Sequence, residues 1–94
     1  MTRSVRLTIR GRVQGVGYRA WAGDAARALG LAGWVRNRTD GTVEAVASGD
    51  DGAIERFIAA CGQGPGMARV TAVEAIDISA AEVDGPGFEY RPTI

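Results

Sequence analysis

Nine residues near the N-terminus, GRVQGVGYR at positions 11–19, combine three glycines and two arginines directly after an alternating apolar run. Glycines between a strand and a helix let the backbone approach a ligand, and free amides at a helix N-terminus bind anions. The guanidinium of Arg19 can add two charge-assisted hydrogen bonds to an oxyanion. Gly15, Gly17 and Arg19 therefore predict an anion site that suits phosphate.

Three phosphate-loop patterns can be compared with this stretch. A Walker loop needs a lysine, and the chain has none. The spacing Gly15-x-Gly17-x-x-Ala20 fits the dinucleotide fingerprint, but the acid expected about 20 residues later would be Asp40, in a turn, and the chain is short for a doubly wound sheet. A cysteine phosphatase loop would carry its nucleophile where this chain has Val13. The chain thus has the glycines and the arginine of a phosphate-binding loop, here called the cradle (residues 14–19), but not that nucleophile.

The residue types that are missing restrict the chemistry. One cysteine and no histidine leave no ligand set for zinc and no Ser–His or Cys–His pair. A phosphate monoester would be hard to cleave here, because its alkoxide leaves poorly. An acyl phosphate releases a carboxylate, so positioning and charge stabilisation can suffice. Asn37 can hold the attacking water, because its amide offers both donors and an acceptor.

Composition and charge set the class of protein. A chain of 94 residues that is 46% hydrophobic is expected to form one globular domain, residues 1–94. No apolar run approaches the ~18 residues of a membrane span, and the first residues lack a signal peptide, so we expect a cytoplasmic location. Residues 1–38 hold eight arginines and one acid, whereas residues 39–94 hold ten acids and three arginines. We expect most of these arginines to pair with acids after folding.

Hydrophobic periodicity gives the order of the elements. Helices are predicted at 18–29, before Gly30, and after 49–52, where the apolar stripe is Ile54, Phe57, Ile58 and Cys61. Strands are predicted at 5–9, 32–38, 42–48 and 70–78, with a short C-terminal edge strand in 88–94. The β-α-β-β-α-β order predicts an α+β, ferredoxin-like fold: an antiparallel sheet with two helices on one face.

Two motifs identify a resemblance. GRVQGVGYR at 11–19 resembles the acylphosphatase signature G-x-V-Q-G-V-x-[FY]-R, and GWVRNRTDGTVEAVASG at 33–49 resembles the second signature of that family. GPGMARVTAVE at 64–74 and FEYRPT at 88–93 are similar to its C-terminal half. The resemblance implies the ferredoxin-like fold and hydrolysis of small-molecule acyl phosphates by a monomer without a metal or cofactor.

The resemblance also implies roles for matching residues. The Asn37 side chain would orient the attacking water, and the substrate phosphate itself would take its proton. Inorganic phosphate, the product, would be a competitive inhibitor. The phosphate would be bound by the Arg19 guanidinium and by the backbone amides of Gln14, Gly15, Val16, Gly17, Tyr18 and Arg19. The family often has a second proline where this chain has Gly66, in the loop 62–68, which bears on substrate preference and stability more than on activity.

Two other functions fit the same fold. RNA-recognition modules share the element order, and the N-terminal half is basic, but VRLTIR and TVEAVAS contain no aromatic residue for base stacking. We therefore expect no nucleic-acid partner. A non-catalytic phosphate-binding or regulatory domain could share the glycine loop. Release of phosphate from benzoyl phosphate separates this function from catalysis.

Overall fold

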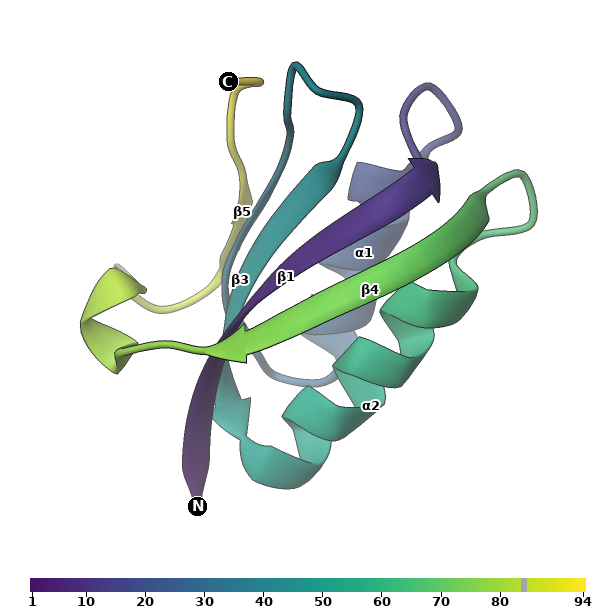
Figure 1. The fold of residues 1–94 in the computed structure, drawn as a ribbon. Coiled ribbons are helices and arrows are strands. Elements are labelled where there is room, and N and C mark those ends of the chain that lie inside the picture. The colour runs from purple at the N-terminus through teal and green to yellow at the C-terminus, as the bar shows by residue number, and fades with distance from the viewer. Residues whose placement is uncertain (84) are drawn as a thin grey trace.

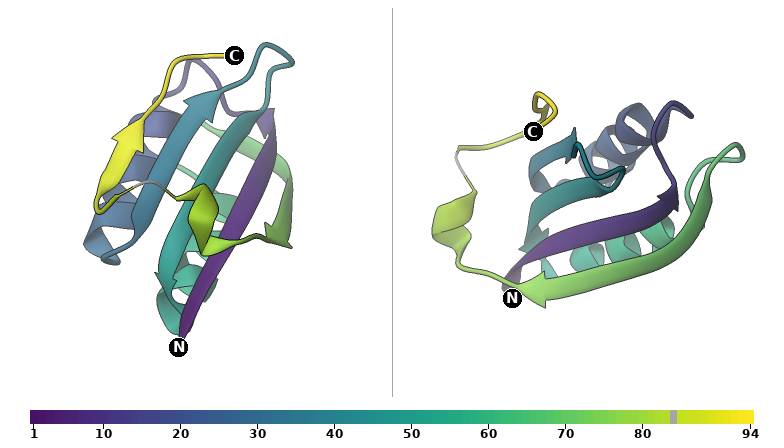
Figure 2. Two further views of the ribbon diagram at one scale, coloured as in Figure 1. Left: turned by 90° about the vertical axis from the view of Figure 1, so that its left-hand side faces the viewer. Right: turned by 45° about the horizontal axis from the view of Figure 1, so that its top comes forward.

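The structure is a computed structural model that describes residues 1–83 and 85–94, and it shows a five-stranded sheet with two helices on one face (Figures 1 and 2). The elements, in chain order, are β1 (Thr2–Arg12), α1 (Tyr18–Ala28), β2 (Ala32–Asn37), β3 (Val43–Asp50), α2 (Asp51–Gln63), β4 (Arg69–Asp77), the short 3-10 helix η1 (Ala80–Glu82) and β5 (Phe88–Tyr90). The predicted ferredoxin-like order is confirmed.

The strands lie in the order β4-β1-β3-β2-β5. The first four pair antiparallel, as predicted, and β5 is a three-residue edge strand. β5 runs parallel to β2, however, so the whole sheet is mixed rather than antiparallel. The physical reason is the connection through η1, which crosses from β4 at one edge of the sheet to β2 at the other (Figure 2).

The core lies between the sheet and the helices. Val5, Leu7 and Ile9 of β1 are fully buried, as their alternation predicted. α2 buries Ile54, Phe57 and Cys61 of the predicted stripe, while Ile58 is half-buried. The Asp50 side chain caps α2 by accepting a hydrogen bond from the Gly52 amide, at 3.1 Å. α1 buries Tyr18, Ala22 and Ala26 in the same core, so both helices pack against one face of the sheet.

Most arginines of the first half pair with acids of the second half, as the charge distribution predicted. The ion pairs are Arg3 with Asp51, Glu55 and Asp77; Arg6 with Glu44 and Glu82; Arg10 with Glu74; Arg36 and Arg38 with Glu44. Arg27 pairs with Asp24 on its own helix. Within residues 1–83 and 85–94, Arg12 and Arg19 are the two first-half arginines without a carboxylate partner.

Gly33 of β2 lies where the sheet leaves no room for a side chain. Its φ is +144°, and a Cβ there would collide with the carbonyl oxygen of Val46 in β3. Gly33→Ala is expected to lower the free energy of unfolding by about 2 kcal/mol or more. Gly66→Ala is the control, because a Cβ at Gly66 meets nothing within 4 Å, and it should stay within about 0.5 kcal/mol of wild type. Urea unfolding measures both, and equal midpoints would contradict the prediction.

Candidate active site

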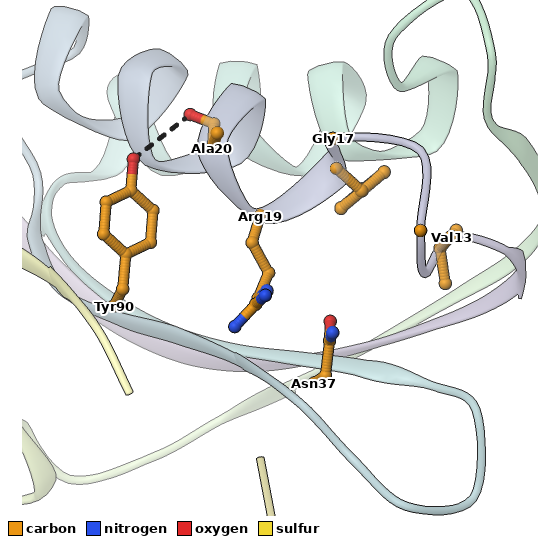
Figure 3. Close-up of a pocket in the computed structure, with 8 residues that line it drawn as sticks. Val13, Gly17, Arg19, Ala20, Asn37 and Tyr90 are labelled. Carbon is orange, nitrogen blue, oxygen red and sulfur yellow. Dashed lines mark hydrogen bonds between the residues drawn. The ribbon is translucent and has the colours of Figure 1, made fainter. Parts of the chain in front are cut away.

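A pocket of about 330 Å³ lies between the start of α1, the loop before it and the end of β2 (Figure 3). This volume is in the range of small-molecule sites. The lining residues come from three segments that are far apart in the sequence: Val13, Gly15, Gly17, Tyr18, Arg19 and Ala20 from the loop and the start of α1, Asn37 from β2, and Tyr90 from β5. Both parts of the chain that sequence analysis selected, the glycine loop and Asn37, therefore meet in one cavity.

The loop before α1 presents backbone to this pocket. Gly15 and Gly17 have φ of 74° and 78°, in the left-handed region that favours glycine. Gly17 is the N-cap of α1, no side chain caps the helix, and its first turn contains no acidic residue. The amides at this helix end can therefore donate to a ligand, and the helix dipole favours a negative charge there.

Arg19, the second residue of α1, supplies the positive charge of the pocket. Its half-buried side chain extends from the helix toward the end of β2, where Asn37 lies (Figure 3). No carboxylate in the described part of the chain pairs with it. The planar guanidinium can therefore bind an oxyanion in the pocket with two parallel hydrogen bonds.

Asn37 is the last residue of β2, and its side chain points into the pocket (Figure 3). Its Oδ1 is buried and, among the described residues, has no hydrogen-bond partner. The backbone of Asn37 is fixed, because its carbonyl oxygen accepts from the Ile94 amide at 3.3 Å. Buried acceptors are nearly always paired, so an unpaired one in a cavity suits an oxygen that binds a water or a ligand.

The Gln14 side chain joins the two halves of the pocket. Its Nε2 donates to the carbonyl oxygens of Arg38, at 2.7 Å, and Thr42, at 2.8 Å, both in the turn after β2. This ties the glycine loop to the strand end that carries Asn37. Gln14 does not line the pocket, and neither does Val16, which packs against the core.

Comparison with known proteins gives the family. A family model described as Acylphosphatase matches residues 5–90. The acylphosphatase of Rhodospirillum rubrum is 46% identical over 92 residues, which is 98% of this chain and 99% of the relative. The chain belongs to the acylphosphatase family. It is therefore a hydrolase that splits acyl phosphates into a carboxylate and inorganic phosphate.

Further comparisons agree with this family. The acylphosphatase of Azoarcus sp. (strain BH72) is 56% identical over 87 residues, covering 93% of this chain and 87% of the relative. The crystal structure of acylphosphatase from Bacillus subtilis superposes with a TM-score of 0.89 at 35% identity, over 97% of this chain and 99% of that one. The ferredoxin-like arrangement is thus that of solved acylphosphatases.

Two reactive groups of this acylphosphatase, the Tyr18 hydroxyl and the Cys61 thiol, are buried. The Tyr18 hydroxyl donates to the Cys61 carbonyl oxygen at 2.6 Å, and burial raises the pKa of Tyr18 far above its usual value. Burial also raises the pKa of the Cys61 thiol to about 12. Cys61 is thus a core residue, as expected, and the Tyr18 hydroxyl is held in a hydrogen bond inside the core.

Sequence reasoning missed three residues of the acylphosphatase pocket: Val13, Ala20 and Tyr90. Val13 and Ala20 flank the recognised motif, so proximity in sequence could have indicated them. Tyr90 belongs to β5, and only the parallel pairing of β5 with β2 brings it to the pocket. The available signal was the FEYR segment itself, which carries an aromatic residue on a predicted edge strand.

Proposed function

We propose that this acylphosphatase binds the substrate phosphate with the backbone amides of residues 14–19 and the Arg19 guanidinium, while Asn37 holds the attacking water. One observation carries the proposal: the Arg19 guanidinium and the buried Oδ1 of Asn37, neither of which has a partner among residues 1–83 and 85–94, face the same cavity. The first suits an anion, and the second suits a water hydrogen. Together they support a mechanism in which a water attacks a phosphate bound beside it.

The reaction then needs few groups. The water oxygen attacks phosphorus, the bond from phosphorus to the acyl oxygen breaks, and the electron pair leaves on a carboxylate that needs no proton. The water proton passes to a phosphate oxygen, since none of the lining residues carries an imidazole, carboxylate or thiol. The protein contributes orientation and stabilisation of the transferring phosphoryl charge.

The alternative functions have less support. A domain that only bound phosphate would need the loop and Arg19. It would not account for the buried Asn37 oxygen, which has no partner among the described residues. An RNA-binding surface would need aromatics on the central strands, and β1 and β3 have none. The aromatic residue on the helix-free face, Trp34, is 6% exposed, with the guanidinium carbons of Arg36 and Arg91 at 4.7 Å and 4.9 Å from its ring centroid.

The direct test is release of phosphate from benzoyl phosphate by the purified protein, with and without excess EDTA. We expect the same rate in both, because a carboxylate leaves without electrophilic assistance and the chain has no histidine to bind a catalytic metal. Loss of activity on chelation, restored by magnesium, would contradict the metal-free mechanism. Binding of phosphate without any turnover would instead support the non-catalytic alternative.

The proposal includes how the protein works in solution. The single domain of residues 1–94 acts as a monomer, since the mechanism uses only the glycine loop, Arg19 and Asn37 and needs no residue from a second copy. The one cysteine is buried and free, so the fold needs no oxidising compartment, in keeping with a cytoplasmic location. No helix in residues 1–83 or 85–94 is long and apolar enough to cross a membrane. Inorganic phosphate is expected to compete with substrate for the cradle.

A further inference from the structure

The pocket has more room than a phosphate group fills. Its volume is about 330 Å³, whereas phosphate fills about 150 Å³ if each non-hydrogen atom takes the ~30 Å³ share of a water molecule. Figure 3 shows Gly17 and Val13 on one side of Arg19 and Tyr90 on the other. If the phosphate binds against the glycine loop, the acyl group of the substrate occupies the other end of the pocket, where Tyr90 lies.

Tyr90 is 47% exposed, yet its ring is held in place. Nη1 of Arg27 donates to its hydroxyl at 3.2 Å, and the Arg27 guanidinium carbon lies 5.0 Å from the ring centroid. The hydroxyl also donates to the carbonyl oxygen of Ala20, at 3.4 Å (Figure 3). The Tyr90 hydroxyl is thus occupied by hydrogen bonds within the protein. The part of Tyr90 that can contact a ligand in the pocket is its ring.

Gly23 makes the position of this ring possible. It lies inside α1, where glycine is less favourable than alanine. A Cβ at Gly23 would lie 2.8 Å from the Tyr90 hydroxyl oxygen and 2.9 Å and 3.0 Å from two ring carbons. The ring could not remain there beside any larger residue. The glycine that lowers the helix propensity of α1 therefore lies where the Tyr90 ring needs the space.

We propose that Tyr90 binds the acyl group of the substrate and makes this acylphosphatase prefer aromatic acyl phosphates to small ones. This inference rests on the proposed function, because it takes the phosphate to be bound by the glycine loop and Arg19. A fixed aromatic ring favours a second flat ring through offset or edge-on contact, and such a contact corresponds to about 2–10-fold in binding. A group as small as acetyl would gain much less from it.

The test is the ratio of kcat/KM for benzoyl phosphate to kcat/KM for acetyl phosphate. In Tyr90→Ala this ratio should fall by about 2–10-fold, whereas Tyr90→Phe, which keeps the ring, should retain it. Glu89→Ala is the matched control, because Glu89 is an exposed neighbour in β5 outside the pocket. Gly23→Ala keeps the tyrosine but displaces the ring, so the ratio should fall in this variant as well.

Two measurements separate the outcomes. The inhibition constant of inorganic phosphate should stay the same in Tyr90→Ala, which shows that the cradle is intact. An unchanged ratio in Tyr90→Ala or Gly23→Ala, or an equal loss on both substrates, would overturn the inference and leave Tyr90 a structural residue. Wild-type protein that hydrolyses neither substrate would instead overturn the proposed function.

Discussion

Arg19→Ala is expected to abolish most turnover and, with it, inhibition by inorganic phosphate. The guanidinium is the cation that lines the pocket, and no carboxylate among the described residues neutralises it. Its removal should lower kcat/KM by about 10³-fold or more, as for other groups that stabilise a transferring phosphoryl group. Phosphate-release kinetics on benzoyl phosphate measure the loss, and phosphate inhibition measures the binding.

Two further variants sharpen this prediction. Arg19→Lys should rescue little, because an ammonium is a point charge and cannot replace the planar fork. Arg12→Ala is the matched control, since Arg12 is also an arginine without an ion pair in the described part of the chain but lies outside the pocket. It should keep wild-type activity.

Thermal unfolding gives an independent readout of the Arg19 site. Phosphate at 100 times its Kd should stabilise wild type by about 2.7 kcal/mol, because it binds only the folded state. Arg12→Ala should be stabilised equally, and Arg19→Ala should not. Equal stabilisation of Arg19→Ala and wild type would move the anion site away from Arg19.

The fold could be predicted because each element carries its own pattern. The alternation of Val5, Leu7 and Ile9 and the stripe through Ile54 and Phe57 are local signals, and the structure confirms both. β1 is longer than the predicted 5–9, running from Thr2 to Arg12. Its ends are polar and are held by backbone pairing with β3 and β4, which leaves no trace in side-chain periodicity.

The candidate site likewise contains residues that local sequence patterns predict and residues that such patterns miss. Gly15, Gly17 and Arg19 could be selected because a positive φ and an anion each require particular residue types. Tyr90 was missed, because the FEYR segment does not show which strand it pairs with, and the place of Tyr90 depends on the crossover that brings β5 alongside β2. Nor could the sequence show that the Gln14 side chain bridges the glycine loop to the turn after β2. These contacts are long-range and have no local pattern.

Asn37→Ala is expected to separate catalysis from binding. We propose that Asn37 orients the attacking water and makes no contact with the ground-state phosphate, so its loss should raise the barrier and leave the cradle intact. Both kcat and kcat/KM should fall together, by roughly 10²–10³-fold, as when a preorganised hydrogen-bonding group is removed. Steady-state kinetics on benzoyl phosphate, with the phosphate inhibition constant measured in parallel, test both halves of this statement.

Asn37→Asp is the harsher comparison, because it is nearly isosteric but places a negative charge beside an anionic substrate. It should lose affinity for phosphate as well as turnover, whereas Asn37→Ala should lose turnover alone. The difference between the two variants depends on the Asn37 amide facing the cavity that Arg19 also lines, as it does in the structure. Most of the turnover surviving in Asn37→Ala, or its phosphate affinity falling as far as in Arg19→Ala, would contradict the water-positioning role.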